Sequence, residues 1–292
     1  MLNEHGLIRC LWMILFSYMV VFSLPLARAV QPMPFILVSD VDDTVRVTNV
    51  SNKFKMVKNN FLKKEIFSGM PELFKNITNK STLPESQRLL FLSGAPFEMK
   101  ISNFKKDFTK PLRNLLSCQN FPEKTCSPFP IYELKVREIT KKITVYDFKT
   151  KILEKKYKSL QENFILIGDD TESDPKVYEN FSTLRKDHIM AIYIHKITEK
   201  NFMLPLGQIY FLTAYDIALH ERMSGRLKDN EVAEIGDAVY KGSDDTFFPN
   251  FQACPTPGQY EKINDLPQEL RELKKNIEQR IDKICSSKQK DK

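Results

Sequence analysis

The chain has 292 residues, a formal net charge of +7 and 28% charged residues. This length suits one large α/β domain with or without an appendage, and the interspersed charges argue against a large disordered tail. The basic balance favours anionic ligands such as phosphate esters, nucleic acid or anionic lipid headgroups, but it does not choose among them.

The first segment has the pattern of an export signal. A short start containing Arg9 precedes an apolar run over residues 11–26, and Ala27-Arg28-Ala29 follows as a small-x-small cleavage pattern. We interpret residues 1–29 as a secretory signal peptide cleaved after Ala29, which predicts a secreted or periplasmic protein. The alternative is an uncleaved anchor, although the run is shorter than the roughly 20 apolar residues that a full span needs.

Residues 30–215 alternate between apolar runs and amphipathic stretches, which is typical of the α/β class with a doubly wound parallel sheet. Continuous apolar runs predict strands that are buried on both faces. These runs are residues 35–38, 89–92, 164–167, 189–194 and 209–212. Helical patterns between them cover residues 70–76 and 149–160.

Residues 216–292 are predicted to form a helical C-terminal extension packed on the domain. Helical patterns cover residues 215–227 and 230–240, and a final helix, capped by Asp265, follows with Pro267 near its start. Apolar side chains at spacings of three and four give that helix one apolar face. We expect this face to pack on the core rather than to bind a membrane surface or a partner.

Four cysteines remain once the signal is removed, and they are Cys118, Cys126, Cys254 and Cys285. An even count in an exported chain indicates disulfides, and four cysteines allow three pairings. We favour Cys118–Cys126, which closes a short loop, and Cys254–Cys285, which fixes the last helix. No CxxC motif or Cys/His cluster supports a zinc site.

Acidic clusters follow two of the predicted strands. Asp40 and Asp42 come directly after the first strand, and Asp169 and Asp174 follow a later one. Ligands of open α/β sheets bind outside the carboxyl ends of the strands, so we expect these carboxylates to meet there. A cation between them would relieve their repulsion. A hard ion such as Mg²⁺ fits best because no Cys or His accompanies them.

These residues predict phosphoryl transfer. One carboxylate can attack phosphorus while a second handles the proton of the leaving group. A third strand ends in Ser93-Gly94, which offers a hydroxyl and an unhindered backbone N–H. Together with a metal ion and a lysine, these groups would balance the negative charge of the transition state.

The motifs resemble those of the haloacid dehalogenase superfamily, and within it the phosphatidate phosphatase catalytic domain of the actin-patch-protein type. The resemblance covers residues 34–196 and implies a Rossmann-like fold with a small flap or cap. It rests on five ordered words, which are DVDDTVR at 40–46, GMPELF at 69–74, SGAPF at 93–97, FILIGDDTESDPKVY at 164–178 and AIYIH at 191–195.

The resemblance also implies roles for the acidic residues. Asp40 would be the nucleophile that forms an aspartyl-phosphate, and Asp42 would be the general acid and then the general base. The expected metal site consists of Asp40, Asp42 through its backbone carbonyl, Asp169, and Asp174 directly or through water.

The remaining roles fall on uncharged groups and a lysine. Ser93 would hold the transferring phosphoryl group, and Thr44 and Gly94 would bind substrate. Lys149 is the favoured catalytic lysine and Lys151 is its rival.

The chain departs from the family pattern at three positions. Ala95 replaces the usual Ser, Phe97 the usual Trp and Asp170 the usual Ser. Asp170 is expected to add negative charge beside the metal, where it could tighten the ion or repel an anionic substrate. Glu172 is interpreted as an ordinary loop charge. The histidines lack partners at ligand spacing and are interpreted as structural, and they include His188, His195 and His220.

The sequence therefore predicts a Mg²⁺-dependent phosphomonoesterase with a phosphate-ester substrate, and phosphatidate or another lipid phosphate at a membrane surface is favoured. We expect no nucleic-acid partner, and the sequence indicates no oligomeric state. The enzymatic alternative acts on a soluble phosphate ester or a phosphoprotein. The alternative from another class is a secreted binding protein on a phosphatase scaffold, and the intact acidic set argues against it.

Overall fold

The computed structural model describes residues 32–49, 65–96, 98–101, 104–107, 109–118, 128–137, 143–157, 161–199, 203–256, 260 and 263–290. Pro32–Lys292 form one compact unit, and the expected signal peptide lies outside the described residues. Within the described part, no helix is both long enough and apolar enough to cross a bilayer.

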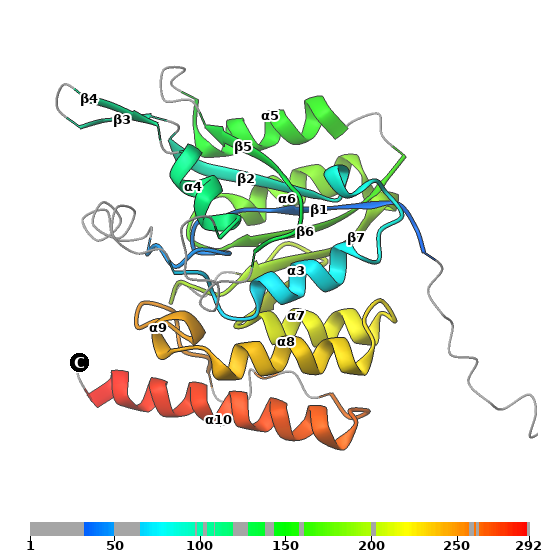
Figure 1. Cartoon of the computed structure of the whole chain (residues 1–292), viewed down its shortest axis with the longest axis vertical. Helices are drawn as coiled ribbons and strands as arrows, with labels where there is room; N and C mark the ends of the chain where they lie inside the picture. Colours follow the sequence, from blue (N-terminus) through cyan, green and yellow to red (C-terminus); the bar gives the residue numbers. More distant parts are fainter. Residues whose placement is uncertain are drawn as a thin grey trace, which may run out of the picture. The chain divides into compact units, whose positions relative to one another are not determined.

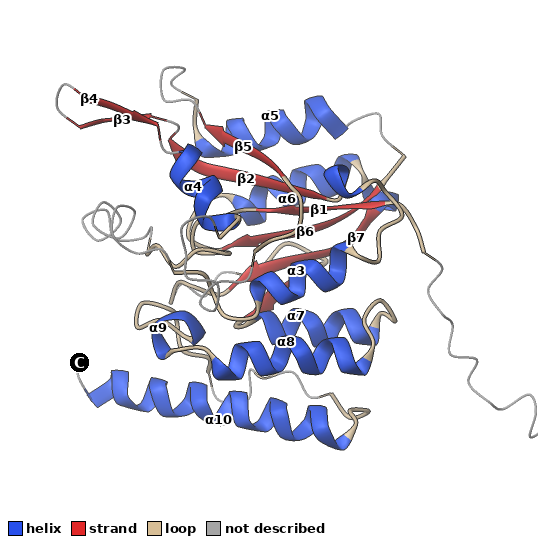
Figure 2. Cartoon of the chain, viewed as in Figure 1, coloured by secondary structure: helices blue, strands red, loops and turns tan. Residues whose placement is uncertain are grey.

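A six-stranded parallel sheet forms the centre of this unit (Figure 2). The strand order is β5-β2-β1-β6-β7-β8, and each neighbouring pair is parallel. The strands are β1 (Phe35–Ser39), β2 (Leu89–Pro96), β5 (Glu133–Arg137), β6 (Asn163–Asp169), β7 (Ile189–His195) and β8 (Gln208–Phe211). A separate antiparallel hairpin consists of β3 (Glu98–Ile101) and β4 (Phe104–Asp107), and it extends away from the end of β2 (Figure 1).

Helices cover both faces of the sheet, as expected for a doubly wound fold. The α-helices are α3 (Met70–Thr78), α4 (Thr109–Leu116), α5 (Val145–Tyr157), α6 (Asp174–Leu184), α7 (Ala214–Met223), α8 (Asp229–Lys241), α9 (Asp244–Phe247) and α10 (Gln268–Lys290). Short 3₁₀ turns lie at Glu85–Gln87 and Lys186–His188. Helices α5 and α6 pack on one face, α3 and α7 pack on the other, and α8 and then α10 lie beyond them (Figure 1).

The two faces correspond to two hydrophobic clusters, and the strands supply both because successive side chains alternate. On β1, Ile36 and Val38 point to the cluster under α5 and α6, and Phe35 and Leu37 point to the larger cluster. The C-terminal helices complete the larger cluster with Ile235, Val239, Leu270, Ile277 and Ile281. The last helix thus packs its apolar face on this cluster.

Some elements differ from the sequence expectation. The strand β5 and the hairpin were not predicted, and α5 begins four residues earlier than its pattern indicated. Helix α10 begins at Gln268, and the carbonyl of Pro267 accepts its first hydrogen bond from the N–H of Arg271. Asp265 therefore lies before the cap position, and the capping role assigned to it is wrong. The boundary expected at residue 215 falls inside α7.

The small flap or cap expected between the first and second motifs stays a prediction, because residues 50–64 of that stretch lie outside the described residues. The segments on either side of these residues are described. The N–H of Val47 donates to the carbonyl of Glu65 at 3.0 Å, and the N–H of Phe67 donates to that of Val45 at 2.9 Å. The two chain segments that flank residues 50–64 are thus paired antiparallel beside the first motif.

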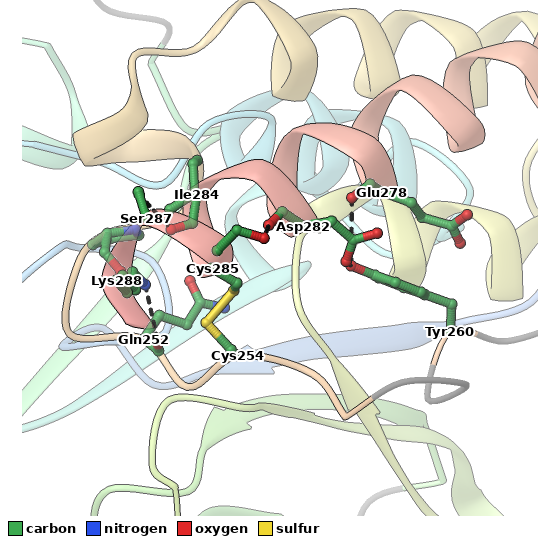
Figure 3. Close-up of a disulfide and its surroundings, with 11 residues drawn as sticks. Gln252, Cys254, Tyr260, Glu278, Asp282, Ile284, Cys285, Ser287 and Lys288 are labelled. Carbon is green, nitrogen blue, oxygen red and sulfur yellow. Dashed lines mark hydrogen bonds between the residues drawn. A yellow bond between two sulfur atoms is a disulfide. The ribbon is translucent and has the colours of Figure 1, made fainter. Parts of the chain in front are cut away.

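The predicted disulfide between Cys254 and Cys285 is present and joins α10 to the segment before it (Figure 3). Cys118 is also disulfide-bonded. Cys126, its predicted partner, lies outside the described residues, so the first pairing stays a prediction.

Candidate active site

Sheet register brings the two acidic motifs together. Ser39, the last residue of β1, lies opposite Ile167 on β6, and the N–H of Asp40 continues the ladder by donating to the carbonyl of Ile167 at 2.9 Å. Asp169 ends β6, so it leaves the sheet beside Asp40. Ser39 also lies opposite Phe91 on β2, which places Ser93 at the same edge.

The turn after β1 is held from within. Its centre, Asp43, has a φ of 58°, and its carboxylate accepts hydrogen bonds from the N–H groups of Thr48 and Asn49 at 3.0 and 2.6 Å. The Thr48 hydroxyl donates to the same oxygen at 2.8 Å. A left-handed conformation is costly for a residue with a side chain, and these bonds offset that cost. Asp43 is thus a structural acid, although it stands between the predicted site residues.

Thr44 lies between two of the predicted acids. Its hydroxyl oxygen is 3.4 Å from Oδ2 of Asp40 and 3.1 Å from Oδ2 of Asp169. The hydroxyl can therefore donate to either carboxylate and hold the two at a fixed separation. Nothing in this geometry tests the substrate-binding role predicted for Thr44.

The structure places Lys149, and not Lys151, among the acids. Lys149 lies on α5 with none of its side chain exposed, and its Nζ is 2.6 Å from Oδ1 of Asp40. It also forms an ion pair with Asp174. Lys151 is exposed on the same helix.

Asp174 is the first residue of α6, and its carboxylate turns back toward β6. The N–H of Asp169 donates to its Oδ2 at 3.3 Å. This approach requires a glycine at position 168, because a Cβ there would lie 2.5 Å from Oδ2 of Asp174. The N–H of Thr171 holds the other acid by donating to Oδ1 of Asp169 at 2.6 Å.

Asp40, Asp169 and Asp174 form one buried group whose carboxylate oxygens lie within 4.8 Å of one another. Burial raises the pKa of Asp40 well above its usual value, Lys149 opposes this, and Asp174 and Asp169 raise the pKa further. Burial likewise raises the pKa of Asp169 well above its usual value, with Asp174 adding to the effect. Burial alone would lower the pKa of Lys149, but Asp174 and Asp40 hold it well above its usual value.

This charge balance fits a divalent cation. When ionised, the three carboxylates carry three negative charges, and Lys149 is the cation paired with them. Buried charge of one sign is costly unless it is paired. The donors are all carboxylate oxygens, which suit a hard ion such as Mg²⁺.

Ser93 and Asp42 face each other at the same edge. The hydroxyl of Ser93 donates to Oδ2 of Asp42 at 3.3 Å, and Ser93 is buried. Nη1 of Arg46 lies 3.7 Å from the other oxygen of Asp42. The Asp42 carboxylate does not belong to the group of three, and its predicted metal contact was through the backbone carbonyl, which stays a prediction.

Asp170 was expected to add negative charge beside the metal. Its carboxylate instead pairs with Lys196, so that charge is balanced outside the acidic group. Its carboxylate pairs with Lys196 at 3.0 Å and accepts hydrogen bonds from the N–H groups of Ile197 and Thr198 at 2.9 and 2.8 Å. Asp170 therefore fixes the chain after β7. Sequence reasoning could not see this, because the partners lie more than 25 positions away.

Two residues near the site were missed. Arg137, the last residue of β5, donates from Nε to the carbonyl of Gly94 at 3.0 Å and so fixes that peptide. Glu172 was interpreted as a loop charge, but its Oε2 would lie 2.8 Å from a Cβ at Gly94. Glu172 is exposed, yet its carboxylate lies beside the Gly94 peptide. A carboxylate therefore stands over the predicted phosphoryl-binding peptide.

The fold and the site together define a class: an α/β protein with a buried acidic group, suited to hold a cation, at the carboxyl ends of its parallel strands. A family model described as phosphatidate phosphatase APP1, catalytic domain, matches residues 35–196, which is more than half of the chain. The chain belongs to this family, which is consistent with the haloacid dehalogenase superfamily and implies a phosphatase-type hydrolase. No significant match was found among curated proteins or among solved structures.

Proposed function

We propose that the protein is a Mg²⁺-dependent phosphomonoesterase that works through an aspartyl-phosphate on Asp40. The observation that carries the proposal is the buried group of Asp40, Asp169 and Asp174 around Lys149, at the carboxyl edge of the sheet in a chain of a phosphatase family. Bound there, Mg²⁺ would neutralise the acids and polarise the phosphoryl oxygens.

In the first step, a carboxylate oxygen of Asp40 attacks phosphorus while the bond from phosphorus to the leaving-group oxygen breaks. That oxygen takes a proton from Asp42, which acts as a general acid. Thr44 and Lys149 hold the two carboxylate oxygens of Asp40 and so fix the plane of the nucleophile. Holding the reacting groups in the right geometry can supply a large part of an enzyme's rate enhancement.

In the second step, Asp42 takes a proton from water, and the resulting hydroxide attacks phosphorus. The bond from phosphorus to Asp40 breaks, inorganic phosphate leaves, and both aspartates return to their starting states. The Ser93 hydroxyl, 3.3 Å from Asp42 Oδ2, and the N–H of Gly94 are suited to hold the phosphoryl oxygens throughout.

We further propose phosphatidate or another lipid phosphate as the substrate, and a site of action outside the cytoplasm. The family match supports the substrate. The N-terminal apolar segment and the Cys254–Cys285 disulfide support the compartment, because disulfides persist where the environment is oxidising.

The test measures phosphate release from dioctanoyl phosphatidate, p-nitrophenyl phosphate and a phosphopeptide, each with EDTA and with Mg²⁺. We expect Mg²⁺-dependent release that is fastest from the lipid, and Asp40→Asn should abolish it. Faster release from a soluble ester or the phosphopeptide would reassign the substrate. No release from any of them would leave the non-catalytic binding protein.

Trapping with ³²P-labelled substrate tests the intermediate. Asp42→Asn should accumulate label on the protein, because water then lacks its base, and Asp40→Asn should accumulate none. Label on the Asp40→Asn protein would contradict the assignment of the nucleophile.

A further inference from the structure

His195 occupies a closely packed position at the end of β7. It is 1% exposed, its ring stacks on Phe211 with centroids 4.6 Å apart, and Phe67 meets it edge-on at 4.7 Å. Two aromatic neighbours at nearly perpendicular orientations fix the plane of the imidazole.

The ring nitrogens connect two distant parts of the chain. Nδ1 lies 2.8 Å from the backbone carbonyl of Asp43, and Nε2 lies 3.0 Å from the side-chain nitrogen of Gln252. Nε2 also lies 3.1 Å from the carbonyl of Leu212, so each ring nitrogen faces a carbonyl, which can only accept. We place the single hydrogen of the neutral ring on Nδ1, because Nδ1 has the shorter carbonyl contact and only Nε2 also faces a donor, the Gln252 amide. Burial lowers the pKa of His195 to about 4, so the ring is neutral near pH 7 and Nε2 can accept from the Gln252 amide.

Asp43 is the left-handed residue of the turn that carries Asp40, Asp42 and Thr44. Its carboxylate is held within the turn by Thr48 and residue 49, and its carbonyl is held from outside by His195. The hydrogen bond from His195 is therefore a contact between the nucleophile turn and the carboxyl end of β7, which is two strands away from β1 in the sheet.

Gln252 lies beyond residue 196, where the family match ends. It is 2% exposed, and its side-chain nitrogen also donates to the carbonyl of Leu212 at 2.8 Å. The backbone carbonyl of Gln252 accepts from Lys288 on α10 at 3.1 Å, and Cys254, two residues further on, forms the disulfide with Cys285 (Figure 3). The C-terminal region thus fixes the place of the Gln252 amide.

We propose that His195 and Gln252 are positioning residues through which the C-terminal region sets the place of the nucleophile turn. This inference rests on the proposed function in one respect, which is that its test measures kcat and KM for phosphate-ester hydrolysis. The two side chains act through each other and through the backbone carbonyl of Asp43, rather than through a carboxylate of the acidic group. Losing the chain of hydrogen bonds should move the carbonyl of Asp43 and misplace Asp40 and Asp42, which lowers kcat more than it changes KM.

The experiment compares His195→Leu, His195→Gln and Gln252→Leu with wild type, using p-nitrophenyl phosphate and Mg²⁺. Displacement of a reacting group by about 1 Å can cost roughly a hundredfold, so we expect His195→Leu to lower kcat by roughly tenfold to a hundredfold. Gln252→Leu should lower it by about tenfold, with KM within about twofold in both variants. His195→Gln should recover part of kcat, because its amide can donate to the carbonyl of Asp43.

Tyr260→Phe is the matched control. Its hydroxyl donates to Oδ1 of Asp282 at 2.8 Å, so the variant loosens α10 without touching the His195 contacts. It should lower the unfolding midpoint and leave kcat unchanged. Unchanged kcat in Gln252→Leu and His195→Leu would overturn the inference. It would also be overturned if kcat fell in Tyr260→Phe as much as in those two variants. If His195→Leu does not fold, the other two variants decide. No hydrolysis by wild type would contradict the proposed function instead.

Discussion

Replacement of Lys149 by methionine tests whether the four site side chains form one electrostatic network. Methionine has a similar length and removes only the charge. The change leaves Asp40, Asp169 and Asp174 buried together without their paired lysine. Removal of one partner from a buried ion pair costs about 3–5 kcal/mol, because the remaining charge is uncompensated. At roughly 2–4 °C per kcal/mol for a chain of this size, Lys149→Met should lower the unfolding midpoint by roughly 6–20 °C in EDTA.

The assay is thermal unfolding followed by circular dichroism, in EDTA and then in Mg²⁺. Lys151→Met is the control, since Lys151 lies on the same helix but is exposed, and it should change stability by no more than about 0.5 kcal/mol. Mg²⁺ should restore part of the loss in Lys149→Met, because the ion supplies positive charge to the same carboxylates. A ligand at a hundredfold excess over its Kd stabilises by about 2.7 kcal/mol.

Equal unfolding midpoints for Lys149→Met and Lys151→Met in EDTA would refute this reasoning. So would a midpoint that does not respond to Mg²⁺ in either variant or in wild type. The first result would mean that the acids are neutral in the folded protein, and the second that they hold no cation.

Four further predictions follow from the site and its surroundings. Ca²⁺ should replace Mg²⁺ poorly in phosphate release, because its longer bonds and higher ligand number should draw both oxygens of Asp40; equal rates would contradict this. Glu172→Gln should lower KM for an anionic ester about fivefold with kcat unchanged, since a charge about 5 Å away costs on the order of 1 kcal/mol; an unchanged KM would place Glu172 outside the substrate path. Reduction of Cys254–Cys285, which closes a loop with a sequence separation of 31, should cost about 3–4 kcal/mol in thermal unfolding. It should lower kcat at 25 °C by less than Gln252→Leu does, because Lys288 still holds the backbone carbonyl of Gln252. The folded-state pKa of His195 is about 4 against 6.5 for the free side chain. As the pH falls, the unfolded chain takes up a proton at this residue before the folded protein does. The free energy of unfolding should therefore fall by about 3 kcal/mol more in wild type than in His195→Gln when the pH is lowered from 6.5 to 4.

The central strands could be read from the sequence because both faces of each are buried. Residues 35–38 and 164–167 are continuous apolar runs, and they became β1 and β6. Strand β5 was missed because it is an edge strand with the sequence ELKVR, in which Leu134 is its one fully buried side chain. An edge strand buries too few of its side chains to require a continuous run of apolar residues in the sequence.

The acidic group could also be predicted, because residues that directly follow parallel strands must meet at one edge. This rule alone predicts that Asp40 and Asp169 lie in the site. The place of Lys149 could be predicted only from the family resemblance, because Lys149 comes from a helix. The part that failed concerns side-chain direction. Asp170 and Glu172 are neighbours in one acidic run, yet the first turns toward Lys196 and the second toward Gly94. Only the tertiary fold determines which carboxylate faces the site.

The C-terminal region shows why a family boundary need not be a physical one. The family match ends at residue 196, before β8, which is the last strand of the sheet. Helices α8 and α10 then contribute to the same hydrophobic cluster as β1 and β6, and the hydroxyl of Tyr215 donates to the carbonyl of Leu270 at 2.9 Å across this packing. Gln252 carries the connection to His195 and so to the nucleophile turn. Because these contacts complete both the core and the proposed support of Asp43, the physical unit is Pro32–Lys292, and residues 35–196 are the part of it that the family model matches.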